Sequence, residues 1–277
     1  MSKSTRSILD IILFLVAFVA IQAVAEFVAA FIFAQIKGLS VNTVVQGMAS
    51  GSFSSVLAIS TVVSSLVTAV LFALLRWTPM SRHWIRTRPW GVLSWVVLLS
   101  LGIILPAEWL YERLEIAMPM QAQALFEGIM KEPWGYAAIG IMAPIAEEVV
   151  FRGAILRVLL EGSSRHWVPI AISAVLFALV HANPAQMPHA FCIGLLLGWM
   201  YYRTGSIIPG IMLHWVNNTL SYVVYNVFPQ YQDAKVIDLF GGNMLKVSLA
   251  VVFSLFIFVP AVYQLHLRMK KVEEVEG

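Results

Sequence analysis

The chain has 277 residues, of which 60% are hydrophobic and only 12% are charged, and its mean hydropathy is +0.82. A soluble domain has about twice that charged fraction, so the composition excludes an ordinary soluble enzyme and indicates a polytopic helical membrane protein. The single cysteine, Cys192, excludes an internal disulfide and most cysteine-based metal clusters. The net charge of +3 says little, because in membrane proteins the placement of Lys and Arg matters more than their sum.

Apolar segments long enough to cross a bilayer recur along the whole chain. The first follows a short basic N-terminus, and its apolar run is too long for a signal peptide, so we interpret it as a membrane span. In chain order we expect eight spans, at about residues 8–33, 53–75, 91–110, 135–158, 168–182, 189–203, 207–227 and 245–266. The predicted fold class is all-α, as a single integral membrane domain over residues 1–277.

Lys and Arg are distributed unevenly between the expected loops. The loop after the second span, "RWTPMSRHWIRTRPW", carries four arginines. If this loop and both termini are cytoplasmic, only five of the 18 Lys and Arg lie outside, namely Lys37, Arg113, Lys131, Lys235 and Lys246. That distribution obeys the positive-inside bias. We therefore predict an integral protein of a bacterial-type cytoplasmic membrane with both termini in the cytoplasm.

Ionisable side chains inside the expected spans are few. Because such groups are costly in hydrocarbon unless they are paired or hydrated, each one is a candidate for function. They are Glu26, Glu108, Glu147, Glu148, Arg152, His181, His189 and His214, with Asn217 and Asn218 as neutral partners. Glu26 and Glu108 could line a cavity or lie near its mouth, and His189 could support another polar group, but their roles are left unassigned.

The stretch "APIAEEVVFRG", residues 143–153, places three charges in the fourth span. Glu148 and Arg152 are four residues apart and share a helix face in the favourable acid-before-base order. Glu147 is rotated by ~100° from its neighbour, so it has no cation on its own helix. The alternative interpretation is a buried charge network that only holds helices together, which explains Glu147 poorly.

Two further polar groups have helical spacing. "FALVH" ends at His181, in the middle or outer half of the fifth span, and "HWVNN" places His214 and Asn218 four residues apart. Each alone could be an interhelical hydrogen-bonding group. Thirty-three residues separate Glu148 from His181, and as many separate His181 from His214. That length lets successive helices cross and return, so we expect the groups to meet in a cavity between the central helices.

A carboxylate, two imidazoles and an amide in such a cavity suit hydrolysis by an activated water. Glu147 could take a proton from the water and His181 could orient it, while His214 and Asn218 could donate hydrogen bonds to an oxyanion. A second chemistry uses Glu147, His181 and His214 as ligands of Zn²⁺. We commit to no metal, and the residues alone leave both chemistries open.

Rival functions of other classes stay open as well. One is a non-catalytic immunity or scaffold protein of the membrane. Another is a transporter with a buried proton relay, although no inverted repeat supports it. The zincin motif HExxH and the GxGD motif are missing.

The motifs "EEVVFR", "FALVH" and "HWVNN", in this order, resemble those of the CPBP family, which comprises CAAX proteases and bacteriocin-processing enzymes. The motif-bearing core covers about residues 135–225. The resemblance implies an eight-helix intramembrane endopeptidase whose substrate is a peptide or protein, lipid-modified or not, with no nucleic acid involved. It implies that Glu147 and His181 position the water and that His214 and Asn218 form the oxyanion hole.

The same resemblance assigns structural support to Glu148 and Arg152, and its second motif includes Phe177. Families of this kind are often described as metalloproteases, and zinc stays possible. Of the two chemistries we favour the glutamate mechanism.

Overall fold

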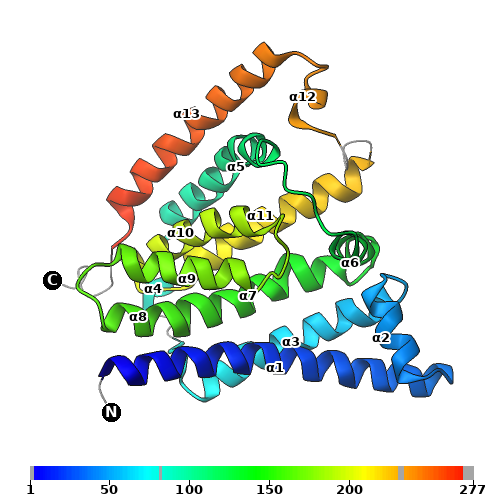
Figure 1. The fold of residues 1–277 in the computed structure, drawn as a ribbon. Helices are drawn as coiled ribbons and strands as arrows, with labels where there is room; N and C mark the ends of the chain where they lie inside the picture. The colour runs from blue at the N-terminus through cyan, green and yellow to red at the C-terminus, as the bar shows by residue number, and fades with distance from the viewer. Residues whose placement is uncertain (1–2, 81–82, 230–233, 271–277) are drawn as a thin grey trace.

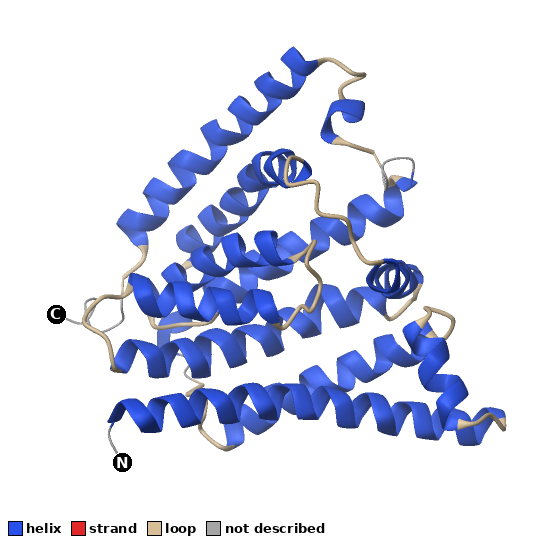
Figure 2. Cartoon of the chain, in the orientation of Figure 1, coloured by secondary structure: helices blue, strands red, loops and turns tan. Residues whose placement is uncertain are grey.

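The computed structural model describes residues 3–80, 83–229 and 234–270, and all regular structure in these residues is helical (Figure 2). The helices in chain order are α1 (Lys3–Lys37), α2 (Val41–Ala49), α3 (Ser54–Leu74), α4 (His83–Arg86), α5 (Trp90–Glu112), α6 (Met120–Lys131), the π-helical segment η1 (Tyr136–Met142), α7 (Ala143–Glu148), the π-helical segment η2 (Val149–Leu156), α8 (Arg157–Glu161), α9 (Trp167–Leu179), α10 (Met187–Thr204), α11 (Ile208–Val227), α12 (Val236–Leu239) and α13 (Met244–Arg268). The predicted all-α class is confirmed.

Four helices are long and apolar enough to cross a membrane: α1 from Thr5 onward, α3, α5 and α13. The remaining expected spans differ from these in length or continuity. The fourth is divided between η1, α7, η2 and α8, and the fifth is the shorter apolar helix α9. The sixth and seventh correspond to α10 and α11. An integral membrane protein is therefore supported, while the count of eight spans stays a prediction.

The helices are arranged around the segment from η1 to α8, which crosses the middle of the molecule (Figure 1). Helices α1 and α3 pack together along one side of it, α9 pairs with α10, and α5 pairs with α13 on the opposite side. Every residue of η2 is buried. A helix that is apolar and buried all round belongs to the centre of a bundle, so its charged residues are held away from lipid.

Both described ends of the chain lie on the same side in Figure 1, at the start of α1 and the end of α13. The basic loop with α4 lies on this side as well, although its residues 81–82 are outside the described residues. The arrangement is compatible with the prediction that both termini lie on one side of the membrane.

Short helices lie in segments that we expected to be loops, and α2 and α6 are the longest of them. Helix α2 begins after Ser40, whose hydroxyl oxygen accepts a 3.0 Å hydrogen bond from the backbone N–H of Thr43, an ordinary N-cap. Helix α6 lies within the acidic segment after the third span. Both are too short to cross a bilayer, which is why hydropathy did not reveal them.

Candidate active site

The central helix is wound partly as π-helix, which changes where its carbonyl groups point. A π turn releases backbone carbonyls from the regular i→i−4 pattern, and such turns are frequent at functional sites. The carbonyl of Val149 accepts a hydrogen bond from the Thr78 hydroxyl at 2.7 Å, and that of Phe151 accepts one from the Ser173 hydroxyl at 3.0 Å. These two buried hydroxyl groups fasten the central helix to its neighbours.

Glu148 and Arg152 form an ion pair in the core. The distance from Arg152 Nη1 to Glu148 Oε1 is 2.7 Å, and neither side chain has any exposed surface. Arg152 Nη2 also donates to the Gly194 carbonyl at 3.2 Å, and the guanidinium carbon lies 4.4 Å from the centre of the Phe177 ring. The ion pair, the hydrogen bond and the face of the Phe177 ring together offset the free energy that burying the Arg152 cation would otherwise cost.

Two glycines make room for this pair. A Cβ at Gly210 would overlap Glu148 Oε2, and a Cβ at Gly194 would press on Ala174 and approach Arg152 Nη2. Neither glycine belongs to a motif of the sequence. Their small-residue positions on α10 and α11 are a signal that could have found them, because close helix packing in membranes uses such residues.

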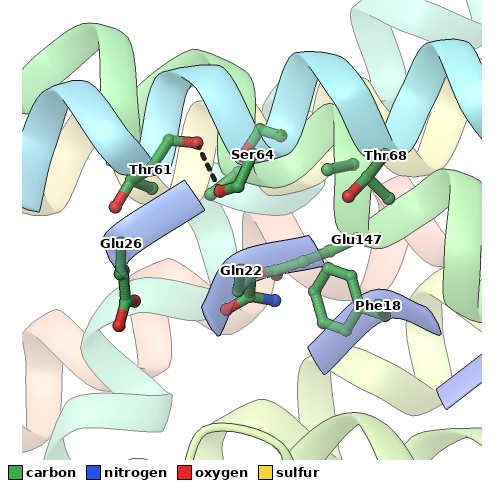
Figure 3. Close-up of a pocket in the computed structure, with 10 residues that line it drawn as sticks. Phe18, Gln22, Glu26, Thr61, Ser64, Thr68 and Glu147 are labelled. Carbon is green, nitrogen blue, oxygen red and sulfur yellow. Dashed lines mark hydrogen bonds between the residues drawn. The ribbon is translucent and has the colours of Figure 1, made fainter. Parts of the chain in front are cut away.

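Glu147 points away from the buried pair. Its side chain is 19% exposed, and it lines a pocket of about 360 Å³, open-mouth space included, between α7, α1 and α3 (Figure 3). The adjacent glutamates thus occupy different environments, as their helical phase predicts. Glu147 faces a cavity and Glu148 faces a cation.

His214 of α11 lies between the two carboxylates. Its Nε2 is 3.6 Å from Glu147 Oε2, and its Nδ1 is 3.5 Å from Glu148 Oε1. The ring is buried and stands edge-on to Phe177, with 5.7 Å between ring centres. The sequence predicts His214 beside Asn218 as an oxyanion donor, and the structure adds that it approaches both members of the glutamate pair.

His181 lies beyond the end of its helix. Helix α9 ends at Leu179, whereas the expected fifth span continued to residue 182, and His181 occupies the turn that follows the helix. Its Nδ1 lies 2.8 Å from the Phe177 carbonyl oxygen. Since a carbonyl only accepts, Nδ1 carries the proton, and Nε2 of the neutral ring is left as an acceptor. The His181 ring packs edge-on against Phe177 at 4.9 Å.

Phe177 is therefore the common support of the site, in contact with Arg152, His181 and His214. His189 belongs to the same neighbourhood, because it lies within hydrogen-bonding reach of Asn217 and in the electrostatic field of both other histidines.

Asn218 is oriented by the π-helical segment η1. Its Nδ2 donates to the carbonyl of Ile139 at 2.8 Å, and its Oδ1 accepts from Asn217 Nδ2 at 3.2 Å. Also on α11, Thr219, the next residue, and Trp215, three residues earlier, both hydrogen-bond to the Tyr136 hydroxyl. These bonds hold η1 against α11 and leave the second N–H of the Asn218 amide available.

Of the two unassigned glutamates, Glu26 lines the pocket with Glu147, whereas Glu108 is not among its lining residues. The other polar residues of the lining were not predicted from the sequence. They are Gln22, Thr61, Ser64, Ser65 and Thr68. Gln22 belongs to α1, and the other four belong to α3. The spacing of three to four residues on α3 is the signal that could have found these four, because it puts their hydroxyl groups on one helix face.

The zinc hypothesis requires at least three ligand side chains grouped around one point. Glu147 and His214 approach each other, but in the described ranges no three His, Cys, Asp or Glu side chains are grouped so that they could hold a metal ion. A zinc site with Glu147, His181 and His214 as ligands therefore does not fit this arrangement.

Residues 130–220 match the model of the type II CAAX prenyl endopeptidase Rce1-like family. The resemblance to CPBP proteases is confirmed. A Bacillus subtilis (strain 168) protein, "Putative membrane peptidase YdiL", is 29% identical over 102 residues, which cover 37% of this chain. The matched segment spans 41% of that relative's length. No solved structure matches the chain.

The Rce1-like region contains all three motifs and every residue of the buried support around Phe177. It supplies only one wall of the pocket. The facing walls come from α1 and α3, at residues 18–26 and 61–68, which lie outside the matched region. The comparison therefore bears on Glu147 and its surroundings, and not on the surface opposite it.

Proposed function

We propose that the protein is an intramembrane endopeptidase that hydrolyses peptide bonds of membrane-associated or lipid-modified proteins or peptides. The observation that carries the proposal is that the two adjacent glutamates lie in different environments. Glu148 is neutralised by Arg152 at 2.7 Å, while Glu147 faces a polar pocket with its carboxylate 3.6 Å from an imidazole. A carboxylate that faces a cavity is suited to act as a general base.

In the proposed reaction Glu147 takes a proton from a water molecule as the water oxygen attacks the carbonyl carbon of the scissile bond. The Nε2 acceptor of His181 orients the same water. The carbonyl oxygen becomes an oxyanion, which receives hydrogen bonds from His214 and from the second N–H of Asn218. When the intermediate collapses, the C–N bond breaks and Glu147 returns the proton to the leaving amine.

The supporting residues have a separate task. Arg152 fixes the charge of Glu148, and Phe177 holds Arg152, His181 and His214 in one arrangement. Rigid support of this kind matters because a misplacement of about 1 Å can cost about 100-fold in rate. We extend the proposal to a bacterial-type cytoplasmic membrane with both termini in the cytoplasm, consistent with the distribution of Lys and Arg.

The test is cleavage by the full chain reconstituted in lipid nanodiscs. The substrates are fluorogenic peptides with an apolar flank, with and without a lipid chain. Wild-type protein should cleave them and Glu147→Gln should not. Full activity of Glu147→Gln would refute the glutamate mechanism. Retention of the cellular phenotype by a protein with Ala at Glu147, His181 and His214 would instead favour the non-catalytic scaffold function.

A further inference from the structure

The pocket in front of Glu147 is lined by one row of residues from each of two packed helices. On α1 the row consists of Phe18, Gln22 and Glu26, which are one helical turn apart. On α3 it begins at Thr61 and ends at Thr68, and all its members are hydroxyl residues on one helix face. Figure 3 draws Glu26 beside Thr61 at one end and Phe18 beside Thr68 at the other. The antiparallel helices thus form an elongated pocket with Glu147 near the Phe18 end.

The lining is acidic and has no compensating cation. It contains the carboxylates of Glu26 and Glu147 and, among its ten residues, no Lys, Arg or His. His214 approaches Glu147, but in the described part of the chain Glu26 takes part in no ion pair. Glu26 is an exposed residue, so its carboxylate is accessible to a bound molecule at this end of the pocket. The natural complement of this end of the pocket is a positively charged group.

A second observation indicates that the pocket is built for a ligand. The Thr68 hydroxyl is fully buried and has no hydrogen-bond partner in the described residues, although it lines the pocket. By contrast, the hydroxyl groups of Thr61 and Ser64 donate back to their own helix. Buried hydroxyl groups are seldom left unpaired, so the one next to Glu147 is available to a bound molecule.

The length of the pocket along α1 can be compared with the length of an extended peptide. Consecutive turns of α1 are about 5.4 Å apart, and an extended peptide advances about 3.5 Å per residue. Glu26 is two turns from Phe18 along α1. Two turns are about 11 Å, or about three residues of extended peptide. Because Figure 3 draws Glu147 between Phe18 and Gln22, a peptide whose scissile bond lies at Glu147 presents to Glu26 the side chain two or three residues away.

We propose, on the basis of the proposed peptidase function, that this pocket is a specificity subsite for a basic side chain, Lys or Arg, two or three residues from the scissile bond. Glu26 is its carboxylate partner, and Thr68 hydrogen-bonds the peptide near Glu147. This subsite is built from α1 and α3, outside the Rce1-like region.

The experiment uses the full chain in nanodiscs and a set of fluorogenic peptides that differ at one position by Lys, Arg, Gln or Glu. The position is varied two and three residues from the cleaved bond, on either side. We expect wild-type kcat/KM to be about 10- to 100-fold higher for Lys and Arg than for Gln at one of these positions, as for a charge-assisted hydrogen bond. Glu26→Gln should abolish this preference, and Glu26→Lys should invert it toward the Glu peptide.

The inversion cannot arise from misfolding, since it requires a gain of cleavage on one substrate. Glu108→Gln, which removes a membrane carboxylate outside the pocket, is the matched control and should keep the wild-type preference. Cleavage of all peptides with equal kcat/KM, or a preference unaffected by Glu26→Lys, would overturn the subsite and leave the peptidase intact. Failure of the wild type to cleave any peptide would overturn the peptidase, and the subsite with it.

Discussion

Replacing the two adjacent glutamates one at a time separates catalysis from support. Glu147→Gln keeps the size of a side chain that is 19% exposed and only loosely paired with His214 at 3.6 Å. Glu148→Gln removes the negative charge from an ion pair in which neither partner is exposed and the two atoms are 2.7 Å apart. The same chemical change therefore has different physical consequences at consecutive positions.

The expected magnitudes follow from these environments. Loss of a general base lowers kcat by about 10²- to 10⁴-fold, or about 2.7–5.5 kcal/mol in the barrier. Because Glu147 is partly exposed and its pairing is long, we expect its replacement to change the free energy of unfolding by less than about 1 kcal/mol. Glu148→Gln leaves the Arg152 charge uncompensated in the core, which costs about 3–5 kcal/mol.

Two measurements distinguish these effects on the same nanodisc samples. Initial rates on the fluorogenic peptides give kcat and KM, and thermal unfolding followed by tryptophan fluorescence gives the change in stability. Glu147→Gln should be inactive with a wild-type unfolding midpoint, whereas Glu148→Gln should unfold at a lower temperature. Glu108→Gln is the control for removal of a membrane carboxylate. Wild-type kcat in Glu147→Gln, or equal destabilisation by both substitutions, would show that the division of labour is wrong.

Further predictions concern the support, the central helix and the metal question. Phe177→Leu should lower kcat by about tenfold or more with little change in KM, because the shared contact of Arg152 and both histidines is lost; a change in KM alone would contradict this. Gly153→Ala should destabilise the fold by about 1–3 kcal/mol, because the added Cβ would overlap Thr78. Gly162→Ala is the control: its added Cβ would lie 3.9 Å from the nearest atom, so the same unfolding assay should show no change in stability. Peptidase activity should persist in the presence of the chelator 1,10-phenanthroline, and mass spectrometry should find less than one zinc ion per protein. Activity that the chelator abolishes and added zinc restores would instead support a metal mechanism.

Local features of the site could be predicted from the sequence because they depend on a single helix. Glu147, Glu148 and Arg152 lie within six residues, so the helical repeat alone decides that Glu148 faces Arg152 and Glu147 does not. The π-helical winding on either side of α7 leaves this local order intact. The end of α9 was harder to locate, since hydropathy does not mark the residue at which a helix stops, and His181 was placed in the helix instead of the turn.

Features that join distant segments could not be predicted in this way. The position of His214 between both carboxylates depends on how closely α11 approaches α7, which Gly210 permits. The pocket depends on the packing of α1 and α3 against the central helix, and hydropathy treats the hydroxyl groups of α3 as minor interruptions of an apolar run. For this protein, then, composition and helical periodicity by themselves determined the all-α membrane class and the separate faces of the two glutamates. Tertiary packing alone decided which groups meet Glu147, because contacts between helices depend on side-chain volume and crossing geometry, which no periodicity along one helix records.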